Sequence, residues 1–385
     1  MQVIVTKKDF SRILDRCQGV ADKKGTMPVL GNVLVEVASP SQLRLAATDL
    51  FLAVSGVIPA EVDKGGSIAV GARDLFERVR MMPEGQLSLT VTEGSALSLR
   101  AVGTARRFTI HGLPGSEFPQ LPKPEASASQ LMLPVGTLSS LIQSTQFSIS
   151  TDDSRLALNS ALIEHENGRL RMVTTDGHRL TKAEAELAKG GDTHTLLVPL
   201  KGIQQLKRIC DDALAEAART DDSSKGEPVL EMLRQGPNAF FRTGTLEFSV
   251  KLVDAQFPPY EQVIPNTSER VIRAPRLGVA EALKAVSVAA SDRTGGVKLT
   301  LTRDTLRFET ESPESGEGFD EVGIEYDGPD ITIGFNARYF LDIANAIPDD
   351  ELLLGLGGEL DPAVVRPASS SQAFDFLAVV MPMRI

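Results

Sequence analysis

A long internal repeat constrains the fold of this chain more than any other feature of its sequence. Residues 45–50 and 172–177 are similar segments whose Thr-Asp pairs lie 127 residues apart. Residues 308–311 form a weaker third copy, 135 residues further along the chain. A period of this length exceeds the 20–50 residues of solenoid and propeller repeats. The sequence therefore predicts whole duplicated domains.

Two further landmarks recur and mark the limits of three units. A strand that leads into a helix is expected at residues 67–76, 195–204 and 331–340. Phe-Pro pairs at Phe118 and Phe257 begin proline-containing stretches, which are typical of linkers. We predict three domains, at residues 1–124, 125–266 and 267–385.

Each unit contains the patterns of two helices and several strands. Alternating apolar and polar residues with short turns favour antiparallel sheets, so we predict an α+β fold. Thr6 is placed to cap the first helix. The other helix signals are apolar residues at helical spacing, and helices are predicted at residues 7–17, 73–82, 135–146, 201–210 and 276–289.

Residues 174–180 (TTDGHRL) lie between two alternating runs and predict a β-hairpin. Asp176 and Gly177 both tolerate positive φ, which a two-residue primed turn requires. His178 and Arg179 are then expected to open the return strand.

Leu180 occupies an unusual position in this predicted hairpin. Successive side chains of a strand alternate between faces, which places Leu180 on the same face as Lys182 and Glu184. Leu180 is therefore either a scattered exposed leucine or part of a contact patch.

The charge of the chain is unevenly distributed. A net charge of -11 and a pI near 5.1 argue against nucleic-acid binding only if the charge is evenly spread. Two predicted helices carry basic pairs away from their apolar stripes, Arg73 with Arg80 and Lys201 with Arg208. Residues 304–330 are densely acidic, and further basic residues near the N-terminus are Lys7, Lys8, Arg12, Arg16, Lys23 and Lys24. These helix faces are either ordinary solvated surfaces or one shared positive surface, and their recurrence at the repeat period favours the second.

Missing motifs argue against catalysis. No Walker A sequence and no GxSxG segment occur, and no GxGxxG segment leads from a strand into a helix. The four histidines lack metal-ligand spacing. Asp176 and His178 suggest an acid–base pair, but no nucleophile is identifiable. We therefore predict a protein that is not an enzyme and that binds no cofactor and no metal.

Two cysteines and an ordinary composition indicate the compartment. Cys17 and Cys210 form no CxxC pair, which favours a reducing environment. No window approaches the ~18 consecutive apolar residues of a membrane helix, and the N-terminus lacks a signal-peptide pattern. We expect a cytoplasmic protein without membrane contact.

The most specific segments resemble the bacterial β sliding clamps, the processivity subunits of DNA polymerase III. These segments are 27–32 (MPVLGN), 175–180 (TDGHRL), 257–265 (FPPYEQVIP), 334–339 (GFNARY) and 379–385 (VVMPMRI). The resemblance covers essentially the whole chain. It implies a head-to-tail homodimer of three-domain subunits, forming a ring with helices lining the inside and sheets outside.

The resemblance also implies the partners. Double-stranded DNA would pass through the ring without recognition of its sequence. A clamp-loader complex would open the ring, and the loader must be separate because this chain has no nucleotide motif. DNA polymerase III α subunit, other polymerases, ligase and mismatch-repair proteins would dock short linear peptides in a pocket between the second and third domains.

The resemblance implies two sets of functional residues. The pocket set is Arg155, Leu158, Thr175, Gly177, His178, Arg179, Leu180, Pro258, Val263, Asn336, Tyr339, Leu360, Met381, Pro382, Met383 and Arg384. The DNA-binding set is Lys24, Arg73, Arg80 and Lys201.

The chain departs from the family pattern at three places near the implied pocket. Residues 261–262 (EQ) stand where a basic residue is frequent, and residues 156–157 (LA) stand where aromatic residues are familiar. Leu360 lies beside residues 361–362 (DP) in a divergent loop.

Two alternatives to a clamp have distinct requirements. A peptide-binding scaffold that never encircles DNA needs no basic helix face. A hydrolase built on Asp176 and His178 needs a nucleophile. The apolar tail at residues 379–383 suits an adaptable docking surface, although it also fits a last core strand.

Overall fold

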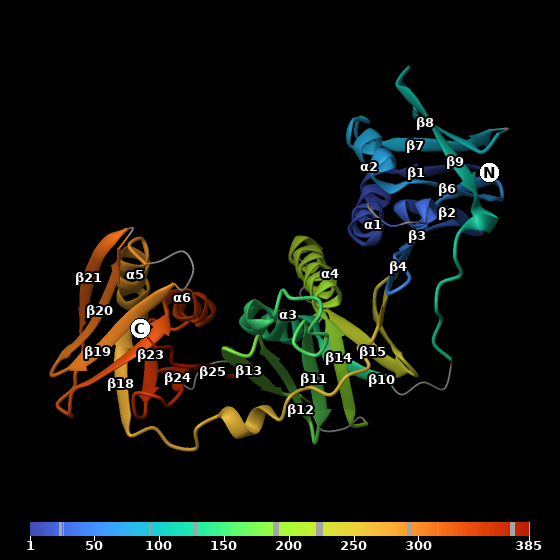
Figure 1. Ribbon diagram of the computed structural model, residues 1–385. Coiled ribbons are helices and arrows are strands. Elements are labelled where there is room, and N and C mark those ends of the chain that lie inside the picture. The colour runs from blue at the N-terminus through green and yellow to red at the C-terminus, as the bar shows by residue number, and fades with distance from the viewer. Residues whose placement is uncertain are drawn as a thin grey trace. The chain divides into compact units, whose positions relative to one another are not determined.

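The computed structural model describes residues 1–22, 25, 27–92, 94–125, 130–187, 192–220, 226–290, 295–313, 315–369 and 374–384. The chain divides into two compact units, and Figure 1 labels their helices and strands. One unit comprises Met1–Gly136 with Gln204–Leu252, and the other comprises Thr137–Ile203 with Val253–Ile385. Each unit therefore combines parts of more than one predicted domain.

The first unit is built on one long antiparallel sheet. Its described strands are β1 (Gln2–Thr6), β2 (Asn32–Ser39), β3 (Gln42–Thr48), β4 (Leu52–Pro59), β5 (Glu61–Lys64), β6 (Ser67–Gly71), β7 (Gln86–Thr92), β8 (Ala96–Ala101), β9 (Arg107–Pro114), β10 (Gln130–Pro134), β15 (Val229–Gln235), β16 (Asn238–Thr243) and β17 (Leu246–Lys251). They follow the order β10-β15-β16-β17-β4-β3-β2-β6-β9-β8-β7-β1-β5. The pairing of β17 with β4 makes strands of the first and second predicted domains neighbours in this sheet.

Helices α1 (Lys7–Val20) and α2 (Ala72–Arg80) of this unit contact each other, as Figure 1 shows. The predicted cap of α1 is confirmed, since the Thr6 hydroxyl accepts a hydrogen bond from the Asp9 backbone N–H at 3.1 Å. The apolar stripe of α1, which includes Phe10 and Leu14, is buried and the helix contacts β3 and β4. Amphipathic spacing thus places each helix on the sheet.

Helix α4 (Leu200–Thr220) is longer than predicted. The sequence placed its end at residue 210, but the alanine-rich run that follows favours a helix and continues it. Asp212 of this extension pairs with Arg16 of α1 at 2.6 Å, and Glu216 pairs with Arg12 at 3.3 Å. The extension therefore offsets two of the basic charges that the sequence assigned to the first helix.

The second unit contains two antiparallel sheets. The first has the order β14-β11-β12-β13-β25-β24-β23-β18 and the second β21-β20-β19-β22. Their described strands are β11 (Ser160–Glu166), β12 (Arg169–Thr175), β13 (Arg179–Glu186), β14 (His194–Pro199), β18 (Arg270–Pro275), β19 (Gly296–Thr302), β20 (Thr305–Ser312), β21 (Gly316–Gly323), β22 (Ile331–Asn336), β23 (Glu351–Leu356), β24 (Ala363–Pro367) and β25 (Asp375–Val380). Further helices of the chain are α3 (Val135–Thr145), α5 (Arg276–Ser287) and α6 (Ala337–Ala346), with short 3-10 turns at η1 (Pro28–Gly31), η2 (Gly115–Glu117), η3 (Gln146–Ser148) and η4 (Tyr260–Val263).

The hairpin of β12 and β13 exists, but the predicted two-residue turn is wrong. Thr175 pairs with Leu180, so four residues lie between the paired positions. Gly177 has a positive φ of 93°, whereas Asp176 does not adopt positive φ. The Asp176 carboxylate instead accepts the backbone N–H groups of His178 at 2.9 Å and Arg179 at 3.0 Å. This side-chain bonding stabilises the wider loop and leaves His178 outside the strand.

Leu180 is not an exposed leucine, because only 3% of its surface is accessible. It lies on the face predicted from strand alternation, the face of Lys182 and Glu184. A chain segment covers this part of the face and packs Tyr260 onto it. Among the described residues, no helix is long and apolar enough to cross a membrane, and no cluster of potential metal ligands is found.

Candidate functional site

A cavity of about 260 Å³ opens in the second unit where four chain segments meet. The segments are the loop before β11, the mouth of the β12–β13 hairpin, the region of η4, and the end of β25. The lining is largely apolar and consists of Arg155, Leu158, Thr175, Gly177, Arg179, Leu180, Pro258, Pro259, Tyr260, Gln262, Val263, Val379 and Met381. An apolar cavity with a few polar groups at its rim can bind the apolar part of a ligand.

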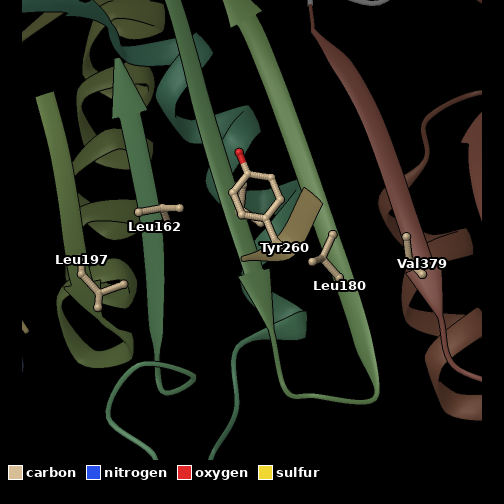
Figure 2. Packing of buried hydrophobic residues seen from close by; sticks show 6 residues of the cluster. Leu162, Leu180, Leu197, Tyr260 and Val379 are labelled. Atoms are coloured by element: carbon tan, nitrogen blue, oxygen red, sulfur yellow. The ribbon is translucent and has the colours of Figure 1, made fainter. Parts of the chain in front are cut away.

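The apolar side of the cavity continues into a buried cluster, shown in Figure 2. Leu180 and Val379 belong to both the cavity lining and the cluster. Leu162, Val173 and Leu197 extend the cluster across β11, β12 and β14, and Tyr260 lies over it. Because the apolar lining rests on packed neighbours, its shape is set by the sheet.

Arg179 joins the hairpin to helix α6. Its guanidinium pairs with Asp176 at 3.0 Å and with Asp342 of α6 at 2.7 Å, and it donates to the Phe147 carbonyl at 2.5 Å. The same group stacks over the ring of Tyr339, 4.6 Å from the ring centroid. The Arg179 side chain is only 8% exposed, so removing its carboxylate partners would leave a buried charge less well compensated. Arg179 therefore has a structural role in addition to lining the cavity.

Arg155 and Gly177 fit closely at the rim of the cavity. Arg155 Nη1 donates to the Asp176 carbonyl at 3.2 Å. A Cβ atom at position 177 would lie 3.1 Å from Arg155 Nη2, and φ there is positive. Glycine is consequently favoured at this position by both space and backbone conformation.

The C-terminal tail is fixed by two backbone hydrogen bonds. The Met381 N–H donates to the His178 carbonyl at 2.9 Å, and the Met383 N–H donates to the Gly334 carbonyl at 2.8 Å. Met381 thereby reaches the cavity that the hairpin lines. Both expectations for residues 379–383 hold in part: Val379 and Val380 are buried in β25, which is a core strand, whereas Met381 to Met383 are half-buried beyond its end.

Nine of the sixteen pocket residues implied by resemblance line this cavity, and seven do not. His178 is exposed and engages Met381 only through its carbonyl in the bonds described above. Asn336 caps α6 by accepting the Arg338 N–H, and Tyr339 lies under Arg179. The remaining four are also outside the lining: Leu360 is 74% exposed, Arg384 is exposed, and Pro382 and Met383 are half-buried.

Four lining residues were absent from the sequence prediction: Pro259, Tyr260, Gln262 and Val379. All four lie inside segments that carried the resemblance, beside residues that were included. Val379 was detectable in principle, because alternation along the last strand relates it to Met381.

The residues predicted to contact DNA are exposed where the structure describes them. Arg73 and Arg80 of α2 point away from the buried Leu75 and Val79, as predicted, and Lys201 is exposed on α4. Arg73 also pairs with Glu77 at 2.9 Å, which offsets part of its charge. Lys24 lies outside the described residues.

Comparison with known proteins decides the family. Sequence models of the DNA polymerase III β subunit match along the whole chain: the N-terminal domain at residues 1–122, the central domain at 132–259 and the C-terminal domain at 261–384. The chain belongs to the β sliding clamps of DNA polymerase III. The matched ranges fit three clamp domains, and the boundaries at 124/125 and 266/267 stay predictions.

Full-length relatives place this β clamp among bacterial replication proteins. The beta sliding clamp of Proteus mirabilis is 31% identical over 386 residues, covering 100% of both chains. A solved Pseudomonas aeruginosa sliding clamp with a ligand is 30% identical, with a TM-score of 0.89 over 100% of both chains. A Bartonella birtlesii sliding clamp bound to griselimycin gives 31% and 0.90 with the same coverage. This β clamp is thus a non-catalytic processivity subunit whose partners are DNA and replication proteins.

Proposed function

We propose that two copies of this β clamp close head to tail into a ring around duplex DNA, in the cytoplasm where bacterial DNA lies. The observation that carries this proposal is the full-length match to three clamp domains. Two chains of three domains each would supply six similar domains for the ring. Symmetric dimers are the commonest oligomers. The ring would hold DNA by topology, so it would need little affinity for phosphate.

The charge distribution is consistent with a ring that slides. Exposed Arg73, Arg80 and Lys201 lie on helices, while the chain as a whole carries a net charge of -11. A modest basic lining would centre the duplex without reading its bases, and an acidic exterior would discourage binding outside the ring. If the protein were a scaffold that never encircles DNA, the basic residues that recur on helices α2 and α4 would have no evident function.

Two sheet edges have the properties needed for the contact between copies. Among the described residues, positions 107–111 of β9 pair only with β8, and β21 pairs only with β20. The first edge is basic, with exposed Arg107 beside Arg100 of β8. The second is acidic and carries exposed Glu317, Glu321 and a 58% exposed Phe319. An unpaired edge is a template for pairing with another chain, and opposite charges would fix which edges meet.

The cavity is proposed to bind short peptides from replication proteins. The clamp-loader complex, DNA polymerase III α subunit, other polymerases, ligase and mismatch-repair proteins are the partners we infer from the family. Burying one leucine or phenylalanine anchor stabilises binding by roughly 1.5–3 kcal/mol. Two or three anchors would give micromolar affinity after the cost of association.

A hydrolase built on the hairpin is not supported by the local geometry. One Asp176 oxygen accepts two backbone N–H groups and the other pairs with Arg179. The carboxylate is thus committed to the loop. His178 lies exposed at the loop, outside the lining of the cavity.

Sedimentation equilibrium tests the dimer. Wild type at micromolar concentration should sediment with twice the 41.3 kDa mass of the chain. Arg100→Glu with Arg107→Glu should yield monomer, and adding Glu317→Arg with Glu321→Arg should restore the dimer. Arg273→Glu with Arg303→Glu changes exposed charges on β18 and in the turn after β19, and serves as the matched control. A monomeric wild type would refute the ring, whereas a dimer insensitive to the first pair would refute only the assigned edges.

A further inference from the structure

A row of charged residues crosses strands β11, β12 and β13, and Tyr260 of η4 contacts this row. Glu164 of β11 lies opposite Arg171 of β12, and Arg171 lies opposite Glu184 of β13. Arg171 Nε pairs with Glu184 at 2.6 Å, and its Nη1 lies 3.5 Å from Glu164. Burial acts to raise the Glu184 pKa, but the hydrogen bond and charge of Arg171, together with the charges of Lys182 and Arg169, lower it overall. The three side chains therefore form a continuous line of contacts centred on Arg171.

The hydroxyl of Tyr260 is bound to this row. It accepts a hydrogen bond from Arg171 Nη1 at 3.0 Å and donates to Glu164 Oε2 at 3.2 Å. Burial, reinforced by the Glu164 carboxylate, raises the pKa of Tyr260, so the hydroxyl keeps its proton. Hydrogen bonds to ionised groups are stronger than those between neutral groups.

The hydroxyl of Tyr260 contacts the charged row, whereas its aromatic ring packs on the apolar cluster beside the cavity. Figure 2 shows the ring between Leu162 and Leu180, with its hydroxyl directed away from Leu180. Phe257 meets the ring edge-on, 6.3 Å between centroids. Tyr260 is also the first residue of η4, whose Gln262 and Val263 line the cavity. We call Tyr260–Val263 the η4 wall of the cavity. Contacts that hold Tyr260 in place therefore also hold the first residue of this wall.

We propose that the Glu164–Arg171–Glu184 row is a positioning device for partner binding, which acts by holding Tyr260 and thereby the η4 wall of the cavity. This inference rests on the proposed peptide-binding function. Glu164, Arg171 and Glu184 do not line the cavity themselves. Their effect on a bound peptide is transmitted through the Tyr260 hydroxyl, which makes Tyr260 the specific link to test.

Arg169 provides a control within the same cluster. It lies two residues before Arg171 on β12, on the same face, and pairs with the same Glu184 at 3.2 Å. It makes no hydrogen bond to Tyr260, and 57% of its side chain is exposed. A general loss of charge in the cluster would affect both arginines, whereas loss of wall positioning would affect Arg171 alone.

The experiment measures anisotropy of a fluorescein-labelled peptide from the polymerase α subunit that carries leucine and phenylalanine anchors. Arg171→Gln should weaken binding about tenfold and Tyr260→Phe about threefold, and the two together should be no worse than Arg171→Gln. Arg169→Gln should bind like wild type. Hydrogen exchange at the amides of residues 260–263 should accelerate in Arg171→Gln and Tyr260→Phe and not in Arg169→Gln, which separates motion of the η4 segment from unfolding.

The outcomes separate the two proposals. If wild type binds the peptide and Met381→Ala weakens binding, but Tyr260→Phe and Arg171→Gln match wild type, the positioning role is refuted and the pocket stands. Equal losses in Arg169→Gln and Arg171→Gln would also refute it. If wild type does not bind the peptide, the peptide-binding function fails and the positioning role fails with it.

Discussion

Leu180 and Val379 lie directly opposite each other in the pairing of β13 with β25, although one belongs to the second repeat and the other to the last strand. Both line the cavity and both belong to its underlying cluster. The pocket is thus assembled across the join between the second and third repeats. Its shape depends on the register of this strand pair, because a slip of either strand by one residue would turn that strand's side chain to the other face of the sheet.

Truncating the apolar lining should abolish peptide binding. Leu180→Ala with Met381→Ala is expected to weaken a labelled α-subunit peptide by at least about tenfold, since one buried anchor contact is worth roughly 1.5–3 kcal/mol. Leu180 is buried, so its truncation also costs about 2–5 kcal/mol of folding free energy. Half-buried Met381→Ala alone is the milder variant and should lose affinity with little change in thermal midpoint. Unchanged affinity in a folded double mutant would remove the pocket from the proposed function.

Reversing helix charges should weaken the hold on DNA. Arg73→Glu with Lys201→Glu is expected to lower loading and retention on nicked circular DNA and to reduce the dependence of binding on salt. Both side chains are exposed, so folding should survive. Arg273→Glu with Arg303→Glu makes the same change of charge outside the helices, on β18 and in the turn after β19, and should behave like wild type. Retention and salt dependence that both stay at wild-type values would show that these helix faces do not meet DNA.

The two thiols should be inert in the folded protein. Burial raises the pKa of Cys17 well above its usual range and that of Cys210 to about 12. A thiol reagent at about pH 8 should modify neither residue in the native state and both in denaturant, because the thiolate is the reactive form. Rapid modification of native protein would contradict this burial.

The raised pKa values of Cys17 and Cys210 predict that the folded protein loses stability as the pH rises above the ordinary thiol pKa. The native state keeps both thiols protonated at a pH where unfolded thiols ionise, so the unfolded state binds fewer protons. The contribution is fully present below the ordinary thiol pKa of 9.0 and is lost as pH rises from there toward about 12. Cys210→Ala should show a flatter decline of unfolding free energy over this range in urea titrations, and an identical decline would contradict the assignment.

Features set by local sequence were predictable, and those set by tertiary contacts were not. The Thr6 cap and the buried stripe of α2 follow from spacing and side-chain chemistry within a few residues. The width of the hairpin loop was missed because the Asp176 side chain satisfies backbone donors that a tight turn would pair. Leu180 looked exposed because the segment that covers it lies some eighty residues further along the chain.

The residues of the cavity likewise include some that the sequence predicted and some that only the folded structure reveals. Resemblance supplied most of the cavity lining, including Arg155 and Val263. It could not supply Tyr260, whose importance arises from a charged row on three other strands. It also placed Leu360 in the pocket, whereas this residue is 74% exposed outside the cavity lining, in a loop that differs from the family pattern.

Retention on circular against linear DNA tests the central claim most directly. Labelled protein is loaded with the clamp loader and ATP onto nicked circular DNA and separated from free protein by gel filtration, before and after one restriction cut. The protein should stay with the circle and be lost from the linear product, because a ring held by topology slides off a free end. Equal retention on both forms, or none on the circle, would contradict a sliding clamp.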